Sequence, residues 1–220
     1  MIFDWDGTLV DSTAVILGAH NHVREIMGLE PWTLDDIFGC SSKSARETYP
    51  DIYGDRSDEA LTILYQYTDN FDLSALKVFD TSAKVLEFIH NHSLPMAVVS
   101  NKRHDPLQRE IDHFGWKNYF PVAIGAGKAA RDKPDAAPLL MAIEALNGDL
   151  LPSDVLYVGD TETDLLCAKN AGCQSALVEE YRDRPDLIEQ YQPDYVCAQL
   201  EDLCDVITLN SADTKAEAIG

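Results

Sequence analysis

Residues 3–12 read FDWDGTLVDS, and the interpretation of the whole chain starts from this stretch. It places two acidic side chains, Asp4 and Asp6, directly behind apolar residues that are typical of a buried strand. Like charges this close repel each other, and a buried carboxylate is costly unless a cation or hydrogen-bond donors compensate it. Other parts of the chain must therefore bring compensating groups to the same place.

Strand-like and helix-like patterns alternate along most of the chain. Such alternation is typical of a parallel sheet with helices on both faces, so we predict a Rossmann-like α/β core. Asp80 is the expected N-cap of the first helix below, and Gly172 is expected just past the end of the fourth. The predicted strands are 96–100, 121–125, 154–160, 174–178 and 194–198, and the predicted helices are 81–91, 106–114, 134–146, 161–170 and 185–191.

Residues 12–78 break this pattern, because they carry helix signals and no convincing strand. The signals lie at 14–28, at 57–71 and at 33–39, where TLDDIFG opens with a Thr-x-x-Asp capping pattern. We predict a helical cap domain at 12–78, inserted into an α/β core domain made of 1–11 and 79–220. Only three residues precede Asp4, which leaves open a truncated first strand or residues upstream of Met1. Residues 209–220 are expected to form a loose tail.

Composition excludes several classes of partner. Among 220 residues, 17 are basic and 38 acidic, and the net charge of −21 argues against nucleic acid or an anionic membrane as the main partner. We find neither an apolar run long enough to span a membrane nor a secretory signal. Five cysteines without a C-x-x-C pair indicate free thiols and a cytoplasmic protein. The His-Asn-His runs at 20–22 and 90–92 are interpreted as solvated helix ends rather than metal pairs.

Polar residues follow the predicted strands at the point where each strand ends. In an open parallel α/β sheet, ligands bind outside the carboxyl ends of the strands, so segments about 150 residues apart are expected to converge on one crevice. The residues concerned are Asp4 and Asp6 after the first strand, Ser100, Asn101 and Lys102 after the second, and Asp160 and Asp164 after the strand at 154–160.

The residue types in this crevice predict phosphoryl chemistry. Four carboxylates need a hard cation, and Mg²⁺ suits oxygen ligands and offsets their repulsion. A carboxylate beside a metal can attack phosphorus to give an aspartyl-phosphate, and a second one can act as general acid and then base. The Ser100 hydroxyl and the Lys133 ammonium can hold phosphoryl oxygens. The backbone N–H groups of Gly7 and Thr8 would add donors.

Four segments together resemble a known family. DWDGTLVDS, VVSNK, the KP at 133–134 and GDTETDL occur in the order of the four motifs of the haloacid dehalogenase-like superfamily, and 12–78 falls where its helical C1 cap lies. The resemblance covers nearly the whole chain. It implies that Asp4 is the nucleophile and a metal ligand, and that Asp6 protonates the leaving oxygen, activates water and binds Mg²⁺ through its carbonyl. It also implies that Ser100 and Lys133 bind the phosphoryl group and that Asp160 and Asp164 hold the metal.

The motifs also discriminate within this superfamily. Its dehalogenases lack the second aspartate, and its phosphonatases resemble D-x-A-G-T, so Asp6 fits phosphatases and phosphomutases. SNK and GDTETDLLCAKNAG look most like phosphoglycolate phosphatases. We therefore expect a Mg²⁺-dependent phosphatase acting on a small phosphorylated metabolite. The alternatives are a β-phosphoglucomutase-like phosphomutase and a non-catalytic protein that binds a phosphate ligand. The substrate, and the choice between monomer and homodimer, stay open.

Several residues have simpler alternative interpretations. Lys43 and Arg46, in the loop 39–46, are candidates to meet a substrate carboxylate or second phosphate, but a solvated helix face explains them equally well. A solvated loop is the favoured interpretation of Lys102 and Arg103, and Trp5 is expected to pack beside the crevice. Further alternatives are turn formation for Asp4 and Asp6, an N-cap for Ser100, a surface site for Lys133 and a first-turn aspartate for Asp164.

Overall fold

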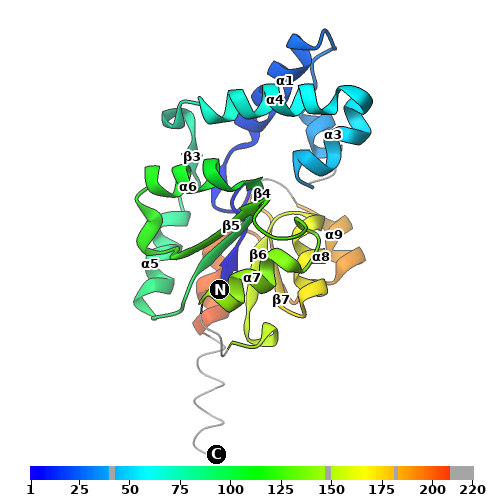
Figure 1. Cartoon of the computed structure of the whole chain (residues 1–220). Helices are drawn as coiled ribbons and strands as arrows, with labels where there is room; N and C mark the ends of the chain where they lie inside the picture. The colour runs from blue at the N-terminus through cyan, green and yellow to red at the C-terminus, as the bar shows by residue number, and fades with distance from the viewer. Residues whose placement is uncertain (40–42, 147–149, 181–182, 209–220) are drawn as a thin grey trace, which may run out of the picture.

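A parallel sheet forms the centre of the larger part of the molecule (Figure 1). The structure is a computed structural model that describes residues 1–39, 43–146, 150–180 and 183–208. The strand order is β5-β4-β1-β6-β7-β8, and all five pairings are parallel, so the predicted α/β class is confirmed. The strands are β1 (Ile2–Phe3), β4 (Ala97–Arg103), β5 (Val122–Ala126), β6 (Leu156–Gly159), β7 (Gln174–Val178) and β8 (Tyr195–Cys197).

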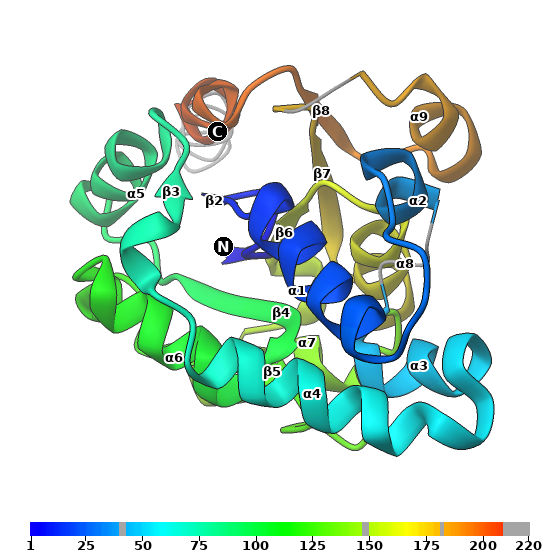
Figure 2. The ribbon, with the colours of Figure 1, turned by 90° about the horizontal axis from the view of Figure 1, so that it is seen from above.

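Each face of this sheet carries its own apolar core. Successive strand residues point to opposite faces, so Ile2 packs with Leu139 on one face and Phe3 packs with Leu107 on the other. Figure 2 shows α5 and α6 on one side of the strands and α8 and α9 on the other. Burial on both faces explains why the strands are almost continuously apolar. The helices are α5 (Ser82–Asn91), α6 (His104–His113), α7 (Ala137–Leu146), α8 (Glu162–Ala171) and α9 (Pro185–Tyr191).

Three predicted helix boundaries can be compared with the structure. Gly172 ends α8 with a φ of 75°, as predicted. The N-cap of α5 is Thr81 and not Asp80, because Asp80 lies in the turn that precedes the helix. Helix α7 begins at Ala137 instead of Pro134, since the Asp135 carboxylate accepts the Ala137 amide hydrogen bond at 2.9 Å and caps the helix there.

A short antiparallel ribbon leads out of the core. It pairs β2 (Val10–Asp11) with β3 (Lys77–Val78). The prediction of no strand within 12–78 is wrong for β3, because a two-residue strand is too short to show the period-two alternation by which strands are detected.

The helices between β2 and β3 lie over the carboxyl ends of the sheet strands (Figures 1 and 2). Three of them, the helices that contain Val23, Tyr49 and Leu64, share an apolar cluster that is separate from both sheet cores. Thr33 and Asp36 cap α2 reciprocally, as their spacing predicts. Helix α3 was not predicted, since it contains a proline. The four helices, called here the α1–α4 group, are α1 (Thr13–Ile26), α2 (Leu34–Gly39), α3 (Ala45–Tyr53) and α4 (Ser57–Asp69).

Two further predictions concern the chain as a whole. The tail expected at 209–220 lies outside the described residues. Within the described residues, no helix is both long and apolar enough to cross a membrane.

Candidate active site

Polar side chains from separate segments meet at the carboxyl edge of the sheet, beneath the α1–α4 group. They line a cavity of about 920 Å³. The predicted site residues on its wall are Asp4, Asp6, Gly7, Lys43, Arg46, Ser100, Asn101, Lys133 and Asp160; Thr8 and Asp164 do not line it but hydrogen-bond to residues that do.

Lys133 lies at the centre of the site. Its Nζ donates to Asp4 Oδ1 and to Asp164 Oδ1, both at 2.7 Å, and to the Tyr157 hydroxyl at 2.9 Å. Lys133 is buried, which alone would lower its pKa, but the two carboxylates outweigh burial and leave that pKa raised. The side chain is therefore charged and not a surface lysine. Tyr157 was not predicted because it lies within an apolar strand and is indistinguishable there from a core residue.

Asn101 fixes the backbone of Lys133. Its Oδ1 accepts the Lys133 amide hydrogen bond at 3.0 Å, and its Nδ2 donates to the Lys133 carbonyl at 3.1 Å. Ser100 lies buried within β4, where its Oγ accepts the Lys102 amide hydrogen bond at 3.2 Å, so it is not a helix N-cap. These contacts hold the hydroxyl and the lysine on one wall of the cavity.

The acidic residues crowd one another. Burial raises the pKa of Asp4 to about 7, although Lys133 opposes the shift. Burial also raises the pKa of Asp160 well above its ordinary range, and the carboxylates of Asp164 and Asp4 add to this effect. Thr8 partly compensates by donating its hydroxyl to Asp160 Oδ1 at 2.9 Å. The repulsion inferred from the sequence is thus present in the structure.

Two glycines make this crowding possible. Gly7 has a φ of +86°, and a Cβ there would lie 2.3 Å from Asp160 Oδ2. A Cβ on Gly159 would lie 2.4 Å from the Cβ of Asp164. The absence of a Cβ at Gly7 therefore leaves space for Asp160. The Gly7 amide donates to the Val10 carbonyl at 2.9 Å, so this N–H is already used within the turn.

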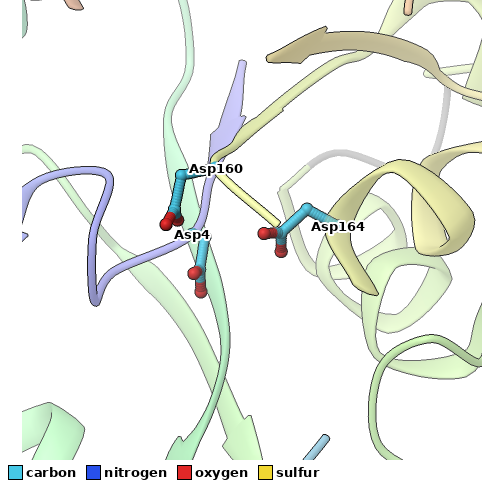
Figure 3. A group of neighbouring side chains, drawn as sticks. All are labelled: Asp4, Asp160 and Asp164. Carbon is cyan, nitrogen blue, oxygen red and sulfur yellow. The ribbon is translucent and has the colours of Figure 1, made fainter. Parts of the chain in front are cut away.

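Asp4 and Asp160 lie next to each other, and Asp164 points toward them from α8 (Figure 3). Each offers one carboxylate oxygen, and the three oxygens lie within 4.8 Å of one another. When the three carboxylates are ionised, Lys133 compensates only one of their charges, which leaves a surplus of negative charge. Hard oxygen donors with such a surplus fit a hard divalent cation.

Asp164 has a second role in its own helix. Its Oδ2 accepts hydrogen bonds from the Thr161 amide at 3.0 Å and hydroxyl at 2.6 Å, while its Oδ1 contacts Lys133. The interpretation of Asp164 as a first-turn aspartate and the site interpretation are thus both compatible with the geometry.

Lys102 corrects the sequence prediction of a solvated loop. Its Nζ is largely buried and donates to Asp6 Oδ1 at 2.7 Å and to Glu110 Oε2 at 2.6 Å. Glu110 also accepts the Trp5 indole hydrogen bond at 2.7 Å. Burial raises the pKa of Glu110. Trp5 packs in the core beside the crevice, as predicted. A clue to Glu110 existed in the sequence, since it lies between the apolar positions Leu107 and Ile111 on the buried face of α6.

A second group that sequence reasoning missed is a contact between the α1–α4 group and the core. Asp132 is buried and accepts hydrogen bonds from Arg46 Nε at 2.5 Å, Arg46 Nη2 at 2.6 Å and the Ser44 hydroxyl at 2.6 Å. Burial opposes ionisation, but these donors and the Gly127 amide lower the pKa of Asp132. Arg46 thus binds a core carboxylate at the cavity wall, while Lys43 is exposed.

Comparison with known proteins agrees with this fold. A family model described as haloacid dehalogenase-like hydrolase matches residues 1–178, and the chain belongs to that family. Among its relatives, Pyrophosphatase PpaX from Halalkalibacterium halodurans is 23% identical over 207 residues, covering 94% of this chain and 95% of the relative. Pyrophosphatase PpaX from Listeria monocytogenes serotype 4b is 25% identical over 208 residues, with the same coverage.

Solved structures share the fold. A hydrolase of the haloacid dehalogenase-like family from Streptococcus pneumoniae superposes with a TM-score of 0.79 at 23% identity, covering 94% of this chain and 96% of that one. A protein named a predicted phosphoglycolate phosphatase, from Haemophilus somnus 129pt, gives a TM-score of 0.80 at 21% identity, with the same coverage.

Proposed function

We propose that this hydrolase is a Mg²⁺-dependent phosphatase that cleaves a small phosphomonoester through an aspartyl-phosphate on Asp4. The observation that carries the proposal is the buried Lys133, bound at 2.7 Å to both Asp4 and Asp164 within a cluster of carboxylates. Relatives named pyrophosphatase and predicted phosphoglycolate phosphatase support phosphoryl chemistry in this family. The free thiols of the described cysteines support a cytoplasmic location.

The reaction divides into two displacements at phosphorus. Asp4 attacks the phosphorus atom, the bond to the ester oxygen breaks, and Asp6 gives its proton to the departing oxygen. Asp6 then takes a proton from water, whose oxygen attacks the phosphoryl group and releases phosphate, which restores Asp4. Ser100 and Lys133 hold phosphoryl oxygens throughout. Lys102 occupies Asp6 Oδ1, so the proton is exchanged at Oδ2.

Asp4, Asp160 and Asp164, with the main-chain carbonyl of Asp6, would hold Mg²⁺. When bound, the ion supplies positive charge that favours transfer of an anionic phosphoryl group. The acidic side chains of this cluster would then serve as ligands in addition to their contacts with Lys133 and Thr8.

We propose further that residues 12–78 act as a cap domain over a core made of 1–11 and 79–220. The bonds from Arg46 and Ser44 to Asp132 hold the cap against the core. A closed cap excludes water from the site during transfer to Asp4 and selects the substrate.

Removal of metal is expected to abolish phosphate release, and added Mg²⁺ is expected to restore it. Mg²⁺ at about a hundredfold excess over its Kd should stabilise the chelated protein by about 2.7 kcal/mol. This gain should shrink at acid pH, because the pKa of Asp4 in the metal-free site is about 7 and its proton competes with the ion. Thermal unfolding at about pH 8 and about pH 5.5 measures both effects. Full activity in chelator would contradict the proposal, as would equal stabilisation at both pH values.

Replacing Glu110 with Gln is expected to weaken proton transfer by Asp6. The variant leaves Lys102 with one carboxylate instead of two, so Asp6 is held less well. We expect kcat/KM to fall by about tenfold to a hundredfold for ethyl phosphate, whose leaving oxygen needs a proton. For p-nitrophenyl phosphate, whose leaving group needs none, it should change little. Glu87→Gln, on the exposed surface of α5, is the matched control. Equal losses on both esters would mean that Glu110 acts only in packing.

Replacing Arg46 with Ala is expected to loosen the cap. Because the Arg46 side chain is 39% exposed, we discount its contacts with Asp132 to about 1 kcal/mol, which corresponds to about a fivefold loss of kcat/KM. Arg56→Ala, which breaks an exposed pair with Glu59 in the same group of helices, should have no effect. The measurement is kcat/KM of both variants for the same ester. Equal kcat/KM values for Arg46→Ala and Arg56→Ala would refute a role of Arg46 in cap closure.

A further inference from the structure

Four aromatic side chains join aliphatic ones on the wall of the cavity that the α1–α4 group forms. Trp32 follows α1, Tyr65 and Tyr67 lie in α4, and Phe71 follows α4, and all four are partly exposed and line the cavity. A pocket of about 920 Å³ lies near the upper end of the roughly 300–1,000 Å³ found for small-molecule sites, and a phosphoryl group with a two-carbon leaving group would leave most of it unfilled. The cavity therefore has room for a leaving group larger than glycolate.

Two of these rings are fixed in place. Asn21 accepts the Trp32 amide hydrogen bond at 2.6 Å and donates to the Trp32 carbonyl at 3.0 Å, and the Arg24 guanidinium lies 4.9 Å from the centre of the indole. The Arg103 guanidinium lies 4.1 Å from the centre of the Tyr65 ring. Rings held in this way offer flat apolar surface at little further cost in conformational entropy.

Five of the positive charges around the cavity are paired with carboxylates, and the sixth, Lys43, is exposed. Within the described residues, six Lys and Arg side chains line it. Lys133 and Lys102 bind the core carboxylates, and Arg46 binds Asp132. Arg103 pairs with Asp69 at 2.8 Å, and Arg184 pairs with Asp186 at 3.0 Å. Lys43 is exposed, so water would screen its attraction for an anion bound there.

His20, which also lines the cavity, adds no positive charge. Its Nδ1 lies 3.0 Å from the Tyr49 hydroxyl, and burial lowers the pKa of His20 to about 4, so the ring is neutral at pH 7. A second anionic group on the substrate would therefore have to displace a carboxylate from an existing pair or add to the local surplus of negative charge.

From these contacts we infer that the substrate is a monophosphate whose leaving alcohol is uncharged and carries a flat ring, as in a nucleoside or an aryl alcohol. The phosphoryl group lies against Asp4 and Lys133, and the ring packs against Trp32 and Tyr65. This inference rests on the proposed phosphatase function, and it disfavours pyrophosphate and phosphoglycolate as preferred substrates.

The test compares esters that differ in one property at a time. Benzyl and ethyl phosphate have leaving alcohols of similar basicity but differ in the ring, while phosphoglycolate adds a charge to the ethyl framework. We expect kcat/KM for benzyl phosphate to exceed that for both by at least about tenfold. Uridine 5′-monophosphate is a second ring substrate. Its kcat/KM, compared with that for benzyl phosphate, shows whether the pocket prefers a nucleoside or an aryl alcohol. Equal values for benzyl and ethyl phosphate, or a preference for phosphoglycolate or pyrophosphate, would overturn the inference and leave the phosphatase proposal standing. Absence of Asp4-dependent phosphate release from every ester would refute both.

Two ring variants locate the preference. Trp32→Ala is expected to lower the ratio of kcat/KM for benzyl over ethyl phosphate by at least about fivefold. Tyr65→Leu, which removes the ring but keeps an apolar side chain in α4, should lower the same ratio even where Trp32→Ala folds poorly. Ile26→Ala alters an exposed apolar residue of α1 that does not line the cavity, and it should leave the ratio unchanged. An unchanged ratio in both ring variants would overturn the inference.

Discussion

The variant Asp4→Asn is expected to lose phosphatase activity by at least about 10⁴-fold while keeping its fold. The amide is nearly isosteric with the carboxylate, but it cannot attack phosphorus. Stability should hold or rise, because the change relieves repulsion with Asp160 and Asp164, and Lys133 keeps its bond to Asp164. The measurements are phosphate release from p-nitrophenyl phosphate and the midpoint of thermal unfolding.

The control for this variant is Asp58→Asn, an equivalent change at an exposed position of α4. It should leave both activity and unfolding unchanged. Undiminished turnover by Asp4→Asn would refute the nucleophile assignment, because the reaction would then proceed without the Asp4 carboxylate.

Replacing Lys133 with Met is expected to damage both activity and stability. The change removes the cation that bonds to Asp4 and Asp164 at 2.7 Å and leaves two buried carboxylates without it. Breaking a buried ion pair in this way costs about 3–5 kcal/mol. Loss of a donor to the phosphoryl oxygens should also lower kcat by about 10³-fold. Denaturant unfolding and steady-state kinetics measure the two effects.

Lys84→Met, on the exposed surface of α5, is the matched control and should behave like the wild type. Added Mg²⁺ should recover part of the lost stability of Lys133→Met, because the ion compensates the same carboxylates. A stable and active Lys133→Met would show that the acid cluster does not need this cation.

The parallel core was predictable from the sequence because its signals are local. Strand β7 and helix α9 begin and end where the sequence predicts. The strand is a short apolar run and the helix is an amphipathic run, and both have clear boundaries. The convergence of Asp4, Ser100 and Asp160 followed from one rule about where parallel strands end. Neither step required knowledge of side-chain contacts.

The missed contacts are those that depend on packing between distant segments. Lys102 looked like a loop residue because Glu110, its partner eight positions on, reaches it only after β4 passes directly into α6. The sequence left Arg46 as either a substrate ligand or a solvated residue, because Asp132, 86 positions away, carries no local signal of its role. Short elements were missed for another reason, since β3 has two residues and α3 contains Pro50.

The most direct test of the central claim is to trap the phosphoryl group on Asp4. The variant Asp6→Asn should still react with p-nitrophenyl phosphate, whose leaving group needs no proton, but should hydrolyse the resulting aspartyl-phosphate slowly. We predict a burst of about one nitrophenolate per protein molecule, and mass spectrometry of the acid-quenched protein should find one phosphoryl group on Asp4. A phosphoryl group on another residue, or turnover without a burst and without any labelled protein, would contradict the account.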